Sequence, residues 1–139
     1  MSRIKLDARL SAVASMVREN SRVADIGTDH GYLLAWLIQN GISPGGIAAD
    51  INKGPLENAR KTVSEAGIAD KVELVLSDGL KNIDENSCDD IVIAGMGGNL
   101  ISDILADCQW IKNKDIHIIA QPMTHAEVLR EYLIKNGFK

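Results

Sequence analysis

Short runs of residues typical of buried β-strands alternate along this chain with segments of helical spacing, and this alternation most constrains its fold. Strands are predicted at residues 22–26, 46–51, 72–76, 90–94 and 116–120, and helices at 5–19, 32–39, 55–66, 99–106 and 124–136. Strand-helix alternation of this kind favours a parallel sheet with helices on both faces. We therefore expect an α/β protein with a Rossmann-like, doubly wound parallel sheet.

Turn and capping residues predict where several of these elements end. Pro55 suits the first turn of one helix, and Pro122 is expected to break the fifth strand. Thr124 is expected to cap the last helix, with Glu127 three residues later completing a capping box. Gly137 is expected to close that helix.

Length and composition fit one ordinary globular domain. The 139 residues are 45% hydrophobic and 24% charged. The N-terminus lacks the apolar core of a signal peptide, and the longest uncharged run, 31–49, is interrupted by turn residues, so no membrane contact is expected. Cys88 and Cys108 lack a CxxC spacing, which favours a cytoplasmic protein with free thiols. No Cys/His cluster has metal-ligand spacing, so no metal is expected.

The net charge of −4 bears on possible partners. A domain that binds nucleic acid without a partner is usually basic. Any contact of this chain with nucleic acid must therefore be local or be supplied by something outside these residues. Arg3, Lys5 and Arg9 form a small basic cluster that could touch phosphate, although a solvated helix end is the favoured interpretation for any single one of them. His117 lies within an apolar strand pattern and is interpreted as structural, and His125 as a surface residue.

A glycine loop follows the first predicted strand, where doubly wound sheets bind ligands. Its glycines, Gly27 and Gly31, allow close approach of the backbone to a ligand. Asp29 occupies the place of the middle glycine in the GxGxxG dinucleotide fingerprint. A carboxylate there would repel a pyrophosphate but suits the ammonium or sulfonium of S-adenosylmethionine. The alternative is a turn without a ligand, and His30 in the loop either shapes the ligand site or lies on the surface.

Three further clusters follow the next strands. Asp50 lies about 20 residues beyond the loop, where an acid can accept hydrogen bonds from ribose hydroxyls, unless it is a solvated loop residue. Asp78 could accept the adenine amino group's hydrogen bond, unless its segment only forms a helix cap or turn. The run 94–98 places three glycines around Met96 where a reactive methyl group should lie, although Met96 is also a common packing residue.

Together these segments resemble one known family. Residues 6–14, 23–33, 77–80, 93–98 and 121–123 are similar to the bacterial tRNA (adenine(22)-N1)-methyltransferases of the TrmK type, which are class I S-adenosylmethionine-dependent enzymes. The resemblance covers essentially the whole chain. Its Asp-His-Gly-Tyr and Ala-Gly-Met-Gly-Gly segments are specific to that family, and the others are generic to class I methyltransferases.

The resemblance implies S-adenosyl-L-methionine as cofactor, S-adenosyl-L-homocysteine as product and tRNA as substrate, and it leaves the oligomeric state open. Asp29 is expected to be catalytic because of its position in the glycine loop, where its carboxylate could stabilise the cationic base or accept an amino proton. The resemblance also implies a cofactor site whose members follow in chain order: Asp25, Gly27, Thr28, Asp29, His30 and Gly31 at the methionine end; Asp50 and Ile51 at the ribose; Ser77, Asp78 and Gly79 at the adenine; Ala94, Gly95, Met96 and Gly97 at the transfer site. The RNA side would include Lys5, Arg9, Gln121 and Pro122.

Two departures qualify the resemblance. The segment 94–97 replaces the Asn/Asp-Pro-Pro-aromatic motif of many amino-group methyltransferases, which disfavours an exocyclic amine as the target. The family usually continues into further strands and a helical C-terminal extension, so we expect residues 1–139 to be a methyltransferase domain truncated before its last strands. The alternatives are a methyltransferase with another substrate, a nicotinamide-dependent dehydrogenase, disfavoured by the missing middle glycine, and a non-catalytic module that retains the cofactor pocket.

Overall fold

In the part of the chain that the structure describes, five parallel strands form one sheet in the order β3-β2-β1-β4-β5. The structure is a computed structural model that describes residues 3–113 and 115–138. The strands are β1 (Val23–Ile26), β2 (Gly46–Asp50), β3 (Val72–Leu76), β4 (Asp90–Met96) and β5 (His117–Pro122). The helices are α1 (Ala8–Ala14), α2 (Tyr32–Gln39), α3 (Lys53–Glu65), α4 (Gly98–Ala106) and α5 (Ala126–Lys135), with 3₁₀ turns at Ala69–Lys71 and Glu85–Ser87.

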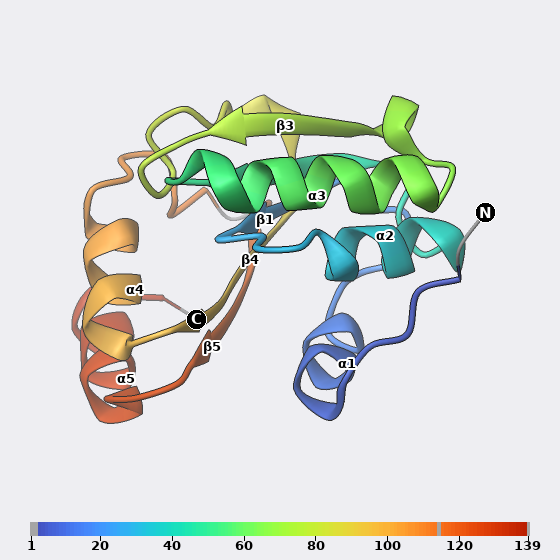
Figure 1. Cartoon of the computed structure of the whole chain (residues 1–139). Coiled ribbons are helices and arrows are strands. Elements are labelled where there is room, and N and C mark those ends of the chain that lie inside the picture. Colours follow the sequence, from blue (N-terminus) through green and yellow to red (C-terminus); the bar gives the residue numbers. More distant parts are fainter. Residues whose placement is uncertain (1–2, 114, 139) are drawn as a thin grey trace.

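The path of the chain reverses its direction across the sheet between β1 and β4. It runs outward from β1 to β2 and β3, then returns to pair β4 with the other side of β1. Helices α1 to α3 pack on one face, and α4 and α5 lie on the other (Figure 1). This arrangement confirms the predicted doubly wound α/β fold.

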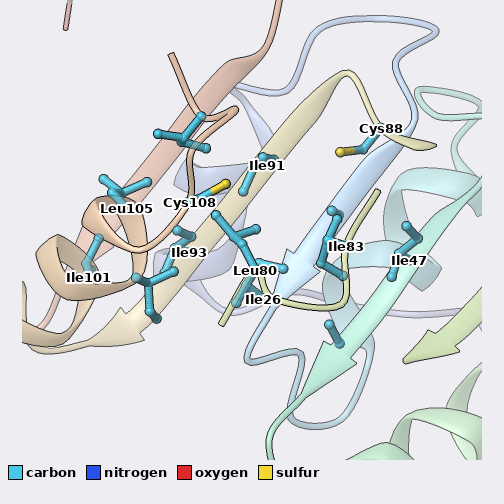
Figure 2. Close-up of a cluster of buried hydrophobic side chains, with 14 of the residues drawn as sticks. Ile26, Ile47, Leu80, Ile83, Cys88, Ile91, Ile93, Ile101, Leu105 and Cys108 are labelled. Atoms are coloured by element: carbon cyan, nitrogen blue, oxygen red, sulfur yellow. The ribbon is translucent and has the colours of Figure 1, made fainter. Parts of the chain in front are cut away.

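Alternate residues of the central strands supply the two layers of the core. Ile91 and Ile93 of β4 face α4, whereas Val92 between them packs with Leu34 of α2. Figure 2 shows the face of the sheet that α4 covers. There, isoleucines of β1, β2 and β4 pack against apolar side chains of the loop that follows β3. Because both faces are covered, the strands are mainly apolar runs, with Asp25 of β1 and Glu73 of the edge strand β3 as charged residues within them.

The N-terminal helix is shorter than predicted. The spacing indicated a helix over 5–19, but α1 spans only Ala8–Ala14. Asp7 caps it by accepting a hydrogen bond from the Leu10 amide at 2.8 Å, which fixes the start. Past its end, the amide of Arg18 donates to the Asp90 carboxylate at 2.9 Å, a contact that draws the chain out of the helical path.

The last strand and helix also differ from the prediction. β5 continues through Pro122, which pairs with Met96, because β5 is an edge strand of the described sheet and a proline there loses no ladder bond on its outer side. The capping box was wrong: α5 begins at Ala126 after His125, whose φ is 52°, and no side chain caps it. The carbonyl of Thr124 instead accepts a hydrogen bond from the Gly98 amide at 2.7 Å. Gly137 closes the helix with a positive φ, as predicted.

Asp90 anchors the amino-terminal end of β4. Its carboxylate is fully buried, accepts from the Arg18 guanidinium at 2.8 Å and lies 3.1 Å from Nδ1 of His117. His117 is therefore a structural histidine, as predicted. This cluster lies at the end of the sheet opposite the glycine loops, so it has no part in the site described next.

Candidate functional site

The carboxyl ends of β1, β2, β3 and β4 meet at one edge of the sheet and surround a cavity of about 330 Å³. That volume lies within the roughly 300–1,000 Å³ range of small-molecule sites. The cavity sits at the switch point between β1 and β4, where ligands of doubly wound sheets bind.

The cavity gathers most of the residues predicted for a cofactor site. Those in its lining are Gly27, Asp29, Asp50, Ile51, Ser77, Asp78, Gly79, Ala94, Gly95 and Met96. The predicted residues outside the lining are Asp25, Thr28, His30, Gly31 and Gly97. Of the four residues predicted on the RNA side, Arg9 lines the cavity, whereas Lys5, Gln121 and Pro122 do not.

Gly27 is required by the geometry of the loop. Its φ is +75°, a conformation that L side chains rarely adopt, and its amide donates to the Ala49 carbonyl at 2.9 Å. A Cβ at this position would collide with the terminal methyl group of Met96. Met96 therefore packs across the loop and joins the two glycine segments into one wall of the cavity.

Asp25 lies beneath the loop. Its side chain is buried, and the Thr28 hydroxyl donates to its carboxylate at 3.0 Å. Burial raises the pKa of Asp25 to about 6, an effect that the Thr28 hydrogen bond opposes and the nearby charge of Asp50 reinforces. Asp25 and Thr28 thus shape the loop from below.

Asp50 is held rigidly at the end of β2. One carboxylate oxygen accepts from the Asn52 amide at 3.0 Å, and the other from the Asp29 amide at 3.4 Å. The residue is buried except where it meets the cavity. A carboxylate oriented in this way retains acceptor sites for the hydroxyl groups of a ligand.

The carboxylate of Asp29 faces outward from the loop and is 73% exposed. Asp29 does not cap the following helix, because the N-cap of α2 is Gly31 and no side chain makes a capping hydrogen bond there. The nearest charged partner of Asp29 is His30, whose Nε2 is 3.8 Å away. The ring of His30 stacks on Tyr32, with centroids 5.1 Å apart, outside the cavity lining.

The end of the cavity at β3 mixes a turn with apolar side chains. The Ser77 hydroxyl donates to the Gly79 carbonyl at 2.8 Å and accepts from the Asn82 amide at 3.1 Å, so it holds the turn. Asp78 pairs with Lys81 at 3.1 Å on the rim.

The sequence interpretation missed three apolar lining residues. Leu100 and Ile104 follow one another on one face of α4, four residues apart, and this spacing was the available signal. Ile26, the last residue of β1, is the third.

A second hollow, of about 750 Å³, lies between β5, α5 and the segment before β5. It shares no lining residue with the cavity at the glycine loops.

Among the described residues, no group of three or more His, Cys, Asp or Glu side chains could hold a metal ion. Within the same part of the chain, no helix is long and apolar enough to cross a membrane.

The fold and the cavity define a class of protein: a doubly wound α/β domain with a polar small-molecule site at its switch point. The chain belongs to the methyltransferase domain family, whose model matches residues 6–139. It is similar to the tRNA (adenine(22)-N(1))-methyltransferase of Bacillus subtilis, with 37% identity over 99% of this chain and 58% of the relative. The chain thus spans a little over half the length of that relative.

Solved structures agree with this assignment. TrmK of Mycoplasma capricolum in complex with S-adenosyl-homocysteine is 32% identical, with a TM-score of 0.83 over 94% of this chain and 57% of that one. A Streptococcus pneumoniae protein solved with S-adenosyl-L-methionine is 34% identical, with a TM-score of 0.90 over 97% of this chain and 64% of that one. Membership of the methyltransferase family decides against the dehydrogenase alternative.

Proposed function

We propose that this chain binds S-adenosyl-L-methionine and that the protein containing it methylates N1 of adenosine 22 in tRNA. The observation that carries the proposal is the cavity itself, which unites the glycine loop, Asp50 and the glycines around Met96 at the switch point. The relatives that bind this cofactor or its product support it. Residues 1–139 would form the cofactor-binding domain.

The donor set of the cavity fits this cofactor. Asp50 is placed to accept hydrogen bonds from the ribose hydroxyls. Ile51 and Leu100 present apolar side chains, 59% and 51% exposed, that suit the faces of an adenine ring. Gly27, whose φ of +75° few L side chains adopt, brings the backbone of the loop to the cavity wall beside Met96.

The protein's part in the reaction is mainly positioning. Bound S-adenosylmethionine supplies a methyl group already activated by its sulfonium. The backbone around Gly95 and Met96 borders the cavity and would hold the target base in line for attack while excluding water. Asp29, with an exposed carboxylate in the lining, would stabilise the positive charge that develops on adenine or accept its amino proton. The target base must leave its stack to reach this position.

The setting is the cytoplasm, where tRNA is modified; the free thiols of Cys88 and Cys108 are compatible with it.

Two measurements test the proposal. S-adenosylhomocysteine should bind in calorimetry, and the protein as its host makes it should transfer labelled methyl groups to a tRNA transcript with adenosine at position 22 but not to one with guanosine there. Absence of binding would refute the cofactor assignment. Binding with equal methylation of both transcripts would point to another nucleoside.

A further inference from the structure

The charges around the cavity are uneven. Three carboxylates, those of Asp29, Asp50 and Asp78, line it, and Arg9 is the one basic side chain among the described lining residues. Arg9 lies in the first turn of α1, whose start is fixed by the Asp7 cap. The sequence pattern grouped Arg9 with Lys5 on a phosphate-binding surface, but Lys5 is exposed outside the lining.

Arg9 is held in place by Gln121, which lies at the carboxyl end of β5, the strand next to β4. Its Nη1 donates to Oε1 of Gln121 at 3.1 Å, a contact between residues 112 positions apart in the sequence. The same oxygen accepts from the Gly95 amide at 3.2 Å. The amide nitrogen of Gln121 lies 3.5 Å from the Met123 sulfur, so both ends of the Gln121 side chain are engaged. This fixes the guanidinium over Gly95.

The guanidinium has donors to spare. Nη1 lies 3.5 Å from the position that a Cβ on Gly95 would take, which locates it at the methionine end of the cavity. Within residues 3–113 and 115–138, no carboxylate lies within ion-pair distance of Arg9. The charge of Arg9 also acts on the buried carboxyl group of Asp25 and opposes the rise of its pKa. The side-chain hydrogen bond of Arg9 is to the neutral Gln121, and a half-buried guanidinium can still bind an anion through its other N–H groups.

We propose that Arg9 is the binding residue for the α-carboxylate of the cofactor's methionine moiety, with Gln121 as its positioning residue. The inference rests on the proposed function, because the ligand is S-adenosylmethionine or its product. S-adenosylmethionine carries an ammonium and a sulfonium, which suit the acidic lining, and its product keeps the ammonium alone. Both compounds carry one α-carboxylate, which requires a cation. Arg9 supplies this cation at the end of the cavity opposite Ser77 and Asp78, where the adenine is expected.

The test compares S-adenosylhomocysteine with its primary amide, which lacks only the carboxylate charge, in calorimetry on the wild type and on R9A. The wild type should bind the acid more tightly. R9A should lose about 10- to 100-fold of the affinity for the acid, the range expected for a charged hydrogen-bonding group, and little of the affinity for the amide. Lys5→Ala is the matched control, a nearby basic residue outside the cavity, and should bind both as the wild type does.

Gln121→Glu is a second variant that does not depend on removing the arginine. A carboxylate of the same shape would pair with Arg9 and compete with the ligand, so this variant should also lose affinity for the acid selectively. If the wild type bound neither the acid nor the amide, the proposed function would be refuted. Binding of the acid by R9A at wild-type strength, or equal loss of acid and amide, would overturn the inference alone. Weakened tRNA binding with unchanged affinity for the acid would assign Arg9 to phosphate.

Discussion

The carboxyl group of Asp25 lies in the protein interior beneath the glycine loop, where its charge is costly. Burial raises its pKa from 3.8 to about 6, so the folded chain holds a proton there over a pH range in which the unfolded chain does not. The free energy of unfolding therefore decreases as pH rises from about 4 to about 6, and the full penalty is present above that range.

Asp25→Asn should therefore stabilise the ligand-free protein at pH 7.5, by at most about 3 kcal/mol, because raising a pKa by one costs the charged form about 1.36 kcal/mol. The asparagine can still accept the Thr28 hydrogen bond. Urea unfolding at pH 4 and pH 7.5 measures the effect, which should vanish at the lower pH. A variant less stable than the wild type at pH 7.5 would show that the ionised carboxylate is stabilised by contacts that burial does not outweigh.

Asp29 offers the sharper test of catalysis. Asp29→Asn keeps the shape of the side chain and its tolerance for a φ of 58°, and removes the charge. We expect S-adenosylhomocysteine affinity to change little and turnover on tRNA to fall by about 100-fold or more, the size of a lost acid-base contribution. Turnover is measured on the protein as its host makes it, with saturating cofactor.

The matched control for Asp29 is Asp103→Asn, which removes an exposed carboxylate of α4 outside the cavity and should leave turnover unchanged. If Asp29→Asn retained wild-type turnover, the catalytic role would be wrong. Equal loss of affinity and turnover would instead make Asp29 a cofactor-binding residue.

At the scale of single residues, the sequence predicted strand ends better than side-chain directions. The polar residues after four strands were found because parallel strands end at one edge. That Asp25 lies below the loop while Asp29 faces the cavity depends on the backbone turn between them, which the sequence pattern does not determine. Arg9 was found as a basic residue, but its place in the cavity depends on Gln121, from a strand far along the chain.

At the scale of elements, α1 is a short helix that carries one functional side chain. Seven residues rarely hold a helix without help, so the Asp7 cap matters. Asp7→Ala should lower the free energy of unfolding by about 1 kcal/mol, the usual value of an N-cap, and should weaken ligand binding by loosening Arg9.

Asp7→Asn separates capping from charge, because asparagine caps as well as aspartate. It should behave as the wild type in urea unfolding and in calorimetry. If both variants were equally unstable, the charge of Asp7 and not its hydrogen bond to Leu10 would be the cause.

The boundaries of the helices and strands show where local sequence patterns stop predicting the structure. The second helix and the third strand were predicted to the residue, because apolar spacing and flanking turn residues agree there. The N-terminal helix was overestimated and the capping box failed for a common reason. Long-range bonds, from Arg18 to Asp90 and from Gly98 to Thr124, satisfy the same backbone groups that a longer helix or a cap would have used.

At the scale of the whole molecule, ligand binding and folding are linked by mass action. S-adenosylhomocysteine at 100 times its dissociation constant should raise the free energy of unfolding by about 2.7 kcal/mol, with a melting temperature that increases with ligand concentration. Thermal melting with NAD at the same concentration is the control and should show no shift. A shift with NAD alone would return the dehydrogenase alternative to consideration.

The pairing of β1 with β4 has a consequence for how the protein is made. β2, α3 and β3 lie between these neighbours in the sequence, so the central strand lacks one partner until much of the chain has left the ribosome. Contacts of such high sequence separation form late and slow folding. The wall made by Gly95 and Met96 exists only after β4 has docked. A nascent chain that ends before β4 therefore cannot bind the ligand, however complete its glycine loop. Ligand binding thus indicates that β4 has paired with β1.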